Sequence, residues 1–288
     1  MTLRNAFDVW QSDLPKLASD AHKYSRGHMV MLGSQGLGAS YLATTAAPRM
    51  GAGIVTLLCD KEYLIANSLK CEPHIVVRAF DTVDQAVEML QGPTNSAFVI
   101  GPGFAPGDKL WDDLPRLALA VLATGKPCVL DAGAITAFKG RAEELFPALH
   151  DKVVLTPHEG EFLRLFGPIE ERQSAVENAT AHIPSVVLLK GPETLIAQNG
   201  QETIINQGAP ACLATAGTGD VLAGMIGSLL AQGMPPFKAA AAGVHYHAQA
   251  AIGSQLGRSM TATDLLPALI NIGSTLGQRI FARPNFDL

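Results

Sequence analysis

The segment Thr215-Ala-Gly-Thr-Gly-Asp220 places small residues and one carboxylate directly before an apolar stretch that runs from 221 to 233. Where a loop turns into a helix, free backbone N–H groups and the positive end of the helix dipole favour a bound anion. Gly217 and Gly219 permit close approaches that a side chain would block. The segment predicts an anion hole beside Asp220, a general base for a hydroxyl that attacks a phosphoryl group. An alternative stays open, in which Thr218 or Asp220 only caps a buried helix.

A second set of motifs follows short apolar runs that are typical of strands buried on both faces. The strands are expected at 29–32, 54–58, 75–77, 97–100, 128–130, 153–155 and 186–189. The motifs that follow them are Gly33-Ser34, Gly101-Pro-Gly103, Asp131, Thr156-Pro-His158 and Lys190-Gly191. Because ligands of open α/β sheets bind at the carboxyl ends of the strands, we expect these motifs to converge on one cleft.

Helical stretches separate most of these runs, as in an α/β sheet with helices on both faces. A helix is expected around 42–50, and the C-terminal third is expected to be helical at 220–233, 237–252 and 263–273 and to cover one flank of the sheet. No linker or charge block divides the chain, so residues 1–288 are interpreted as a single domain with an N-terminal extension over 1–20.

The nucleotide-binding motifs with the best-known spacing are missing. The turn Gly33-Ser-Gln-Gly-Leu-Gly-Ala39 has the wrong glycine spacing for a dinucleotide fingerprint, and no GxxxxGK[ST] is found. Instead, Lys190-Gly191-Pro192-Glu193-Thr194 would supply a cation and backbone amides to phosphates. A Gly-Pro turn with a solvated lysine is an equally ordinary interpretation of that segment.

The histidines and cysteines give weaker evidence for a functional site than the strand-end motifs do. His158 and Glu161 lie three residues apart at a helix start, where they would bind a ligand or a magnesium-bound water, or else form a charged first turn. His245 and His247 would face different directions, one in the core and one exposed, and so form no metal pair. The cysteines are scattered at 59, 71, 128 and 212, without the spacing of a zinc site or a disulfide framework.

Composition narrows the class of protein. The chain has 48% apolar and 16% charged residues, with a net charge of -5, and it lacks a Lys/Arg cluster for nucleic acid. Its apolar stretches are too short and glycine-rich to span a bilayer, and the N-terminus has no signal core. We expect a cytoplasmic enzyme that binds neither nucleic acid nor membrane.

Taken in order, these blocks resemble the NAD(P)H-hydrate dehydratases of the ribokinase-like superfamily over almost all of residues 20–270. The blocks that carry the resemblance are HKYSRG (22–27), GSQGLGASYLATTAAPRMGAGIVTL (33–57), VIGPGF (99–104), KPCVLDAGAI (126–135), VVLTPHEGEF (153–162), LLKGPETLIA (188–197) and ATAGTGDVLAGMIGSLLAQG (214–233). The resemblance implies a ribokinase-like three-layer α/β/α fold with a mostly parallel central sheet. TPHEGEF is the block that best separates this family from the sugar and vitamin kinases of the same fold.

The implied reaction is repair of hydrated nicotinamide dinucleotides. The S-epimer of NADHX or NADPHX would be phosphorylated on its ring hydroxyl by ADP or ATP, and loss of phosphate would restore NADH or NADPH and leave AMP or ADP. ADP is the expected donor, and Mg²⁺ is the expected cofactor.

The resemblance also assigns roles to residues at the matching positions. Asp220 would be the base, Gly217, Thr218 and Gly219 the anion hole, and Ala39, Gly103, His158 and Asp220 the contacts to the hydrated dinucleotide. Lys190, Gly191, Pro192, Glu193, Thr194 and Gly219 would hold the adenine nucleotide, with Glu161 a weaker candidate for organising magnesium. Relatives point to a homotetramer, and the span 1–27 is too short for a fused epimerase, so a separate epimerase is the expected partner.

Several positions depart from the family pattern. Gly133 stands where the family has the second Asp of DAD, Ala216-Gly217 replaces a glycine pair, Thr218 replaces a serine, and Phe104-Ala105 replaces Leu-Gly. The small replacements keep the loop compact, whereas Gly133 removes a carboxylate.

Two other functions are compatible with the same site residues. A small-molecule kinase of the same superfamily, of the hydroxymethylpyrimidine, hydroxyethylthiazole or sugar type, would leave a stable phosphoester. A catalytically silent nucleotide-binding protein would release no phosphate.

Overall fold

A single ten-stranded sheet runs through the molecule, in the order β1-β10-β9-β8-β7-β6-β5-β2-β3-β4. In this computed structural model the backbone of residues 2–280 and the side chains of residues 2–272 are described. Neighbouring strands from β4 to β8 pair in parallel, β9 is antiparallel to both β8 and β10, and β1 returns parallel to β10. The expected α/β class with a mostly parallel sheet is confirmed. The strands are β1 Thr2–Arg4, β2 His28–Gly33, β3 Ile54–Asp60, β4 Val76–Phe80, β5 Ala97–Ile100, β6 Cys128–Leu130, β7 Val153–Leu155, β8 Val186–Leu189, β9 Thr194–Ala197 and β10 Thr203–Asn206.

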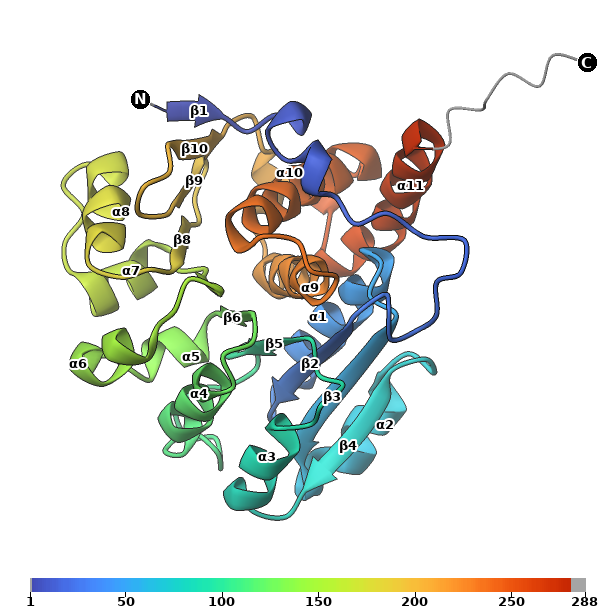
Figure 1. Cartoon of the computed structure of the whole chain (residues 1–288), viewed down its shortest axis with the longest axis vertical. Coiled ribbons are helices and arrows are strands. Elements are labelled where there is room, and N and C mark those ends of the chain that lie inside the picture. Colours follow the sequence, from blue (N-terminus) through green and yellow to red (C-terminus); the bar gives the residue numbers. More distant parts are fainter. Residues whose placement is uncertain (1, 281–288) are drawn as a thin grey trace, which may run out of the picture.

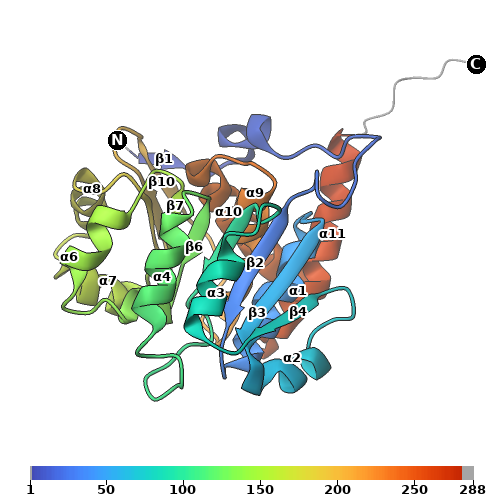
Figure 2. The same ribbon diagram turned by 60° about the horizontal axis from the view of Figure 1, so that its bottom comes forward.

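Helices cover both faces of this sheet (Figures 1 and 2). On one face α1 and α9 lie over β2, β3, β5 and β6, and α10 lies over β7 to β10. On the other face lie the green and yellow helices of Figure 1, among them α3, α4 and α8. The helices are α1 Leu37–Arg49, α2 Leu64–Lys70, α3 Val83–Leu90, α4 Leu114–Ala123, α5 Gly133–Thr136, α6 Ala142–Leu145, α7 Glu159–Phe166, α8 Arg172–Ala181, α9 Thr218–Ala231, α10 Pro236–Ser254 and α11 Ala262–Ile280.

The C-terminal helices are mostly core. Nearly every residue of α9 after Asp220 is buried, and the alanines of α10 pack against the sheet. α11 packs on α10, α1 and α9 as an outer element, so only two of the three expected helices cover the flank directly. Small side chains make this close packing feasible, since a Cβ at Gly224 would lie 2.1 Å from the carbonyl oxygen of Ala43 in α1.

The apolar runs predicted the buried strands well and the edges of the sheet poorly. β5, β6, β7 and β8 match their expected ranges, whereas β4 begins after Ile75 and continues through the exposed residue Arg78. β1, β9 and β10 were not expected, because strands of three or four residues give little periodic signal.

The N-terminal residues are part of the fold. β1 pairs with β10, and the indole of Trp10 is fully buried and donates to Asn5 Oδ1 at 3.0 Å. Asn5 in turn donates to Asn206 Oδ1 at 2.9 Å and to the carbonyl oxygen of Ala241 at 2.8 Å. The segment expected to be an extension therefore closes one end of the sheet.

Of the two histidines on α10, His247 is buried as expected for one member of the pair. His245 is half-buried rather than exposed, because its ring packs edge-on against Trp10 at a centroid distance of 5.2 Å. Among the described helices, none combines the length and the apolar character needed to cross a membrane.

Candidate active site

The motifs that follow β2, β5, β6, β7 and β8 meet at one edge of the sheet, which we call the carboxyl edge. These strands are sequential neighbours in the sheet and run parallel, so their ends point the same way. The glycine loops after β2 and β5 touch, with the amide of Gly36 donating to the carbonyl oxygen of Gly103 at 3.1 Å. A Cβ at Gly36 would lie 2.4 Å from the Cα of Gly103, so a side chain cannot fit there. The five motifs therefore share one edge of the sheet, as expected; that this edge forms one cleft stays a prediction.

Asp220 lies in the first turn of α9, at this same edge. The left-handed backbone of Gly217 (φ 89°) forms the N-cap, and no side chain caps the helix. The hydrogen bonds of the helix begin with the amide of Val221 donating to the carbonyl oxygen of Gly217 at 3.2 Å, so the amides of Thr218, Gly219 and Asp220 point out of its end. The capping alternative for Thr218 and Asp220 is wrong, and the amides are free to bind an anion.

The hydroxyl of Thr218 is turned away from that anion position. It donates to the carbonyl oxygens of Leu213 at 2.8 Å and Thr215 at 3.0 Å, which holds the loop that precedes α9. Thr218 is also buried. Of this residue, only the backbone amide is directed to the expected anion hole.

Lys190 links the end of β8 to the other charged groups. Its Nζ lies 2.7 Å from Asp131 Oδ1 at the end of β6 and 3.8 Å from Glu161 Oε2 at the start of α7. A Cβ at Gly219 would lie 3.6 Å from the same Nζ, which places the ammonium beside the N-terminus of α9. The solvated-lysine alternative is wrong, because only 21% of this side chain is exposed.

The charges of this group shift one another's proton affinities. Burial raises the pKa of Asp220 to about 7, and the nearby Asp131 carboxylate adds to the rise while Lys190 opposes it. Burial alone would lower the pKa of Lys190, but Asp131, Glu161 and Asp220 together hold it above its usual value. Near neutral pH the site thus combines a fixed ammonium with a carboxyl group poised to accept a proton.

The sequence analysis placed Asp131 among the strand-end motifs expected to converge but assigned it no role in the site. Its side chain is only 2% exposed, and it is the closest anionic partner of Lys190. The next residue, Ala132, adopts φ 46° and ψ −114° between β6 and α5, a conformation that costs a non-glycine residue about 1–3 kcal/mol. A tight elbow after a strand is the pattern that would have pointed to this carboxylate.

His158 and Glu161 form a capping box at the start of α7. His158 Nδ1 accepts from the amides of Gly160 and Glu161 at 3.0 and 3.2 Å, and Glu161 Oε2 accepts from the amide of His158 at 2.8 Å. His158 Nε2 lies 3.4 Å from Glu161 Oε1, and about half of the His158 side chain is exposed. The cap fixes the ring and leaves its Nε2 edge beside the site.

The segment Lys190–Thr194 comprises the turn of the hairpin between β8 and β9 and the first residue of β9. Arg172 holds this turn. Arg172 Nη2 donates to the carbonyl oxygen of Glu193 at 3.1 Å and to that of Lys190 at 3.3 Å, and its Nη1 pairs with Glu159. The middle of the turn is exposed, so its amides face solvent beside Lys190. Arg172 was missed by the sequence analysis because it comes from α8, outside the strand-end motifs.

Gly133 and Phe104 are in contact. A Cβ at Gly133 would lie 2.8 Å from both the Cβ and the carbonyl oxygen of Phe104, and 3.0 Å from the carbonyl oxygen of Gly101. A side chain at position 133 would therefore clash with the Cβ and the backbone of the loop after β5.

No cluster of three or more His, Cys, Asp or Glu side chains in the described part of the chain could hold a metal ion. Asp131 and Glu161 do place two carboxylates around Lys190 at the carboxyl edge. Mg²⁺ is commonly held by one or two carboxylates together with substrate phosphates. The donor set thus fits a magnesium ion that arrives with a nucleotide.

Comparisons with known proteins agree with this geometry. A family model described as NAD(P)H-hydrate dehydratase matches residues 28–271. The ADP-dependent (S)-NAD(P)H-hydrate dehydratase of Neisseria meningitidis serogroup B is 37% identical over 250 residues, which cover 81% of this chain and 79% of that protein. A bifunctional NAD(P)H-hydrate repair enzyme of Salinibacter ruber is 35% identical over 90% of this chain, which spans about half (50%) of the length of that enzyme.

The fold resembles those of two solved structures, of which one is a dehydratase. An ADP/ATP-dependent NAD(P)H-hydrate dehydratase from Bacillus subtilis, co-crystallised with ATP and Mg²⁺, has a TM-score of 0.79 at 26% identity and covers 96% of this chain and 99% of its own. A hydroxyethylthiazole kinase from Pyrococcus horikoshii has a TM-score of 0.62 at 19% identity, covering 89% of this chain and 92% of its own. The kinase likeness concerns the fold alone.

Proposed function

The chain belongs to the NAD(P)H-hydrate dehydratase family, and from this membership we propose how the carboxyl edge of its sheet performs the dehydration. The activity is that of a hydro-lyase in nicotinamide nucleotide repair, with an adenine nucleotide as co-substrate. The alternative activity, that of a small-molecule kinase that leaves a stable phosphoester, is supported only by a likeness of fold. The finer points below concern the substrate epimer, the products and the residues.

In the proposed reaction Asp220 takes the proton of the ring hydroxyl of the S-epimer of NADHX or NADPHX. The hydroxyl oxygen bonds to the terminal phosphorus of ADP, and the bond from that phosphorus to AMP breaks. The C–O bond then breaks and its electron pair leaves with the phosphate oxygen. The neighbouring ring carbon gives a proton to the departing phosphate, and the electrons of its C–H bond form the double bond of NADH or NADPH. With ATP as donor the nucleotide product is ADP.

The raised pKa of Asp220 beside free helix amides is the observation that carries this proposal. A carboxyl group with a pKa of about 7 is a far better base near neutral pH than an ordinary aspartate. The amides of Thr218 and Gly219 precede the first hydrogen bond of α9 and would stabilise charge on the transferred phosphoryl group. Lys190 adds a fixed positive charge to that position.

The remaining contacts follow the positions of the loops. Ala39 in the first turn of α1, Gly103 and the exposed edge of His158 would contact the hydrated dinucleotide. The hairpin turn of Lys190, Gly191, Pro192, Glu193 and Thr194, with Gly219, would hold the adenine nucleotide. When bound, Mg²⁺ would neutralise phosphate charge, held by Glu161 and Asp131 together with the nucleotide.

We further propose a cytoplasmic homotetramer that works with a separate epimerase. Ile65 and Leu69 of α2, 73% and 83% exposed, offer apolar surface for subunit contact. Light scattering on the full chain would measure its mass, and a monomer at micromolar concentration would refute the tetramer.

The direct assay mixes purified protein with hydrated NADH, magnesium and either ADP or ATP. We expect recovery of the near-ultraviolet absorbance of reduced nicotinamide with a matching amount of inorganic phosphate. Asp220→Asn should lower kcat by about 10²–10⁴, the range for loss of a general base. Asp112→Asn, an exposed aspartate on the loop before α4, is the matched control. Turnover of Asp220→Asn close to that of the control would remove Asp220 as the base.

A further inference from the structure

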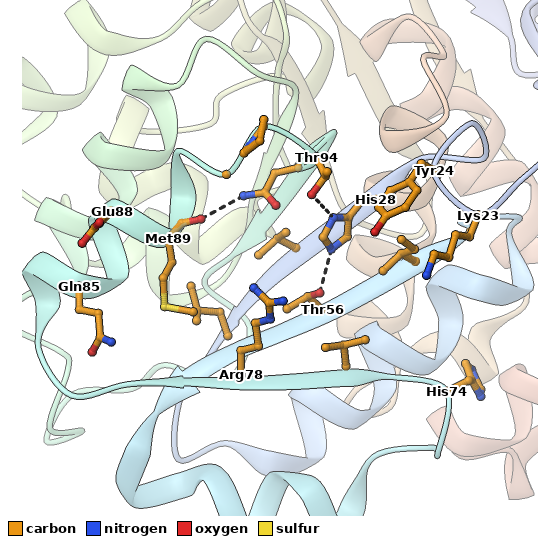
Figure 3. A pocket seen from close by; sticks show the side chains of 18 residues that line it. Lys23, Tyr24, His28, Thr56, His74, Arg78, Gln85, Glu88, Met89 and Thr94 are labelled. Atoms are coloured by element: carbon orange, nitrogen blue, oxygen red, sulfur yellow. Dashed lines mark hydrogen bonds between the residues drawn. The ribbon is translucent and has the colours of Figure 1, made fainter.

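A hollow of about 830 Å³ lies at the opposite ends of the strands from the carboxyl edge. We call it the amino-end hollow; it is bounded by the first halves of β2, β3 and β4, by α3 and by the loop that precedes β5. In a parallel sheet both faces are normally covered by helices. Here α3, only eight residues long, leaves this part of the sheet face open (Figure 3).

The floor of the hollow carries polar side chains among its apolar ones, where a buried parallel sheet would be apolar throughout. His28 of β2, Thr56 of β3 and Arg78 of β4 all line it. Figure 3 shows the guanidinium of Arg78 directed from β4 toward Thr56 and His28. Side chains that alternate along three neighbouring strands have thus brought three hydrogen-bonding groups to one open surface.

The ring of His28 is fixed in this floor. It is 9% exposed, with Nε2 at 2.8 Å from the Thr56 hydroxyl and Nδ1 at 3.4 Å from the Thr94 hydroxyl. Burial lowers the pKa of His28, and the charges of Arg78 and Lys126 lower it further. The ring is therefore neutral near neutral pH, and the positive charge of the hollow comes from its cationic side chains.

Those cations lack anionic partners within the described part of the chain. No carboxylate there lies within ion-pair distance of Arg78 or of Lys23, whose ammonium is 5.2 Å from the ring centroid of Tyr24. Glu88 also lines the hollow but lies on its far side from Arg78 in Figure 3. A guanidinium that rises unpaired from a concave floor is suited to bind a phosphate or carboxylate.

The walls supply the second half of a binding site. Met89 of α3 and Tyr24 give apolar and aromatic surface at the sides of the hollow, and Val30 and Leu58 lie between the polar groups of its floor. Small-molecule sites combine such walls with a few convergent polar groups in volumes of about 300–1,000 Å³. We propose that the amino-end hollow is a second ligand site, which takes a small organic anion with a phosphate or carboxylate next to a planar apolar body.

The test uses two probes that differ only in the anion, phenyl phosphate and benzoate. Each is titrated calorimetrically into the full-length protein, with magnesium and a non-hydrolysable ATP analogue present to fill the carboxyl edge. We expect saturable binding of one or both, and Arg78→Ala should weaken it about tenfold or more, as expected for a charge-assisted hydrogen bond. Binding of phenyl phosphate alone identifies a phosphate ligand, and binding of benzoate alone a carboxylate.

Arg4→Ala is the matched control, because Arg4 is also exposed on an edge strand, at the other edge of the same sheet. Its binding of the probes should equal that of the unaltered protein. The proposal is overturned if neither probe binds at millimolar concentration, if Arg78→Ala binds as tightly as the unaltered protein, or if Arg4→Ala loses as much. None of these outcomes bears on the dehydratase assay, which tests the carboxyl edge.

Discussion

At the scale of single residues, the chemistry depends on how Asp131, Lys190 and Asp220 share charge. Lys190 contacts Asp131 directly at 2.7 Å and lies beside the first turn of α9. Asp131 therefore keeps the ammonium in place while it also disfavours the charged form of Asp220. Burial and the carboxylate of Asp131 raise the pKa of Asp220 and so make it a better base. The ammonium of Lys190 offsets part of the repulsion between the two carboxylates.

Asp220 should make the stability of the protein depend on pH. Its pKa rises from 3.8 to about 7 on folding, so between these values the folded state binds more protons than the unfolded state. Stability from this group is present at low pH and is lost as pH rises from about 4 to about 7. Asp220→Asn has no carboxyl group to ionise, so it does not lose this stability as pH rises. At pH 8 the variant should therefore be more stable than the unaltered protein by a few kcal/mol, at about 1.4 kcal/mol per pKa unit.

Urea midpoints of both proteins at pH 5 and pH 8 would measure this. The advantage of Asp220→Asn should be larger at pH 8, and an equal difference at both pH values would contradict the raised pKa. The catalytic profile has the matching sign, with kcat/KM falling below about pH 7 as Asp220 is protonated.

Replacing Asp131 should move that profile. In Asp131→Asn the carboxylate that raises the pKa of Asp220 is gone and Lys190 is free to pair with Asp220, so the acidic limb should shift to lower pH by about one unit. The pH dependence of kcat/KM is the measurement, with Asp112→Asn as control. A limb that stays in place would show that burial alone sets the pKa of Asp220.

At the scale of elements, the strand ends and the helix starts are locked by backbone contacts that exclude side chains. Gly101 (φ 117°) is the extreme case, since a Cβ there would lie 1.7 Å from the carbonyl oxygen of Asp131. The loop after β5 is thus fitted to the elbow after β6. Arg172 of α8 and the capping box of α7 fix the turns that follow β8 and β7 in a comparable way.

A substitution at Gly133 tests how tightly the loop after β5 packs against the start of α5. Gly133→Ala should destabilise the protein by about 1–3 kcal/mol, the usual cost of overpacking, because the new Cβ would meet Phe104 at 2.8 Å. The denaturant midpoint measures the change. Gly38→Ala is the control, since nothing lies within 4 Å of its Cβ position in α1, and it should be neutral or stabilising by about 0.5–1 kcal/mol.

The same contact predicts that Gly133→Asp, which introduces the carboxylate of the family pattern, will not improve the activity. The carboxylate would require Phe104 and the loop after β5 to move, so activity should fall rather than rise. A more active Gly133→Asp would mean that the loop is softer than its contacts indicate.

At the scale of the whole molecule, the N-terminal residues pack into the core of the C-terminal third. Trp10 is fully buried against Phe7 and Tyr246, with ring centroids 5.0 Å away in each case. Asn5 connects β1 to β10 and α10 through its side-chain amide. The first residues and the C-terminal third therefore share one core.

Trp10→Ala should destabilise the protein by about 3–5 kcal/mol, the cost of removing a large buried aromatic side chain. Leu17→Ala, in the same N-terminal segment but 59% exposed, should change stability by less than about 0.5 kcal/mol. Chemical denaturation of both variants gives the comparison. Equal losses of stability in the two variants would mean that the buried indole of Trp10 contributes no more than an exposed side chain of the same segment.

The sequence by itself determined the buried parallel strands, the helix that follows Asp220 and the convergence of the strand-end motifs. Those features depend on local patterns, namely unbroken apolar runs and glycine-rich turns, which require no knowledge of the partner segments. The family followed from the same blocks, and the family model and the relatives confirmed it.

Only the tertiary structure decided which charges face one another. Asp131, Glu161 and Lys190 come from the segments that follow three neighbouring strands, and their distances follow from strand order and loop packing rather than from spacing in the chain. The clash that forbids a side chain at Gly133 and the open floor around Arg78 are likewise relations between elements distant in sequence. Burial and proximity are properties of the packed molecule, so the proton affinity of Asp220 could only be assigned once the fold was known.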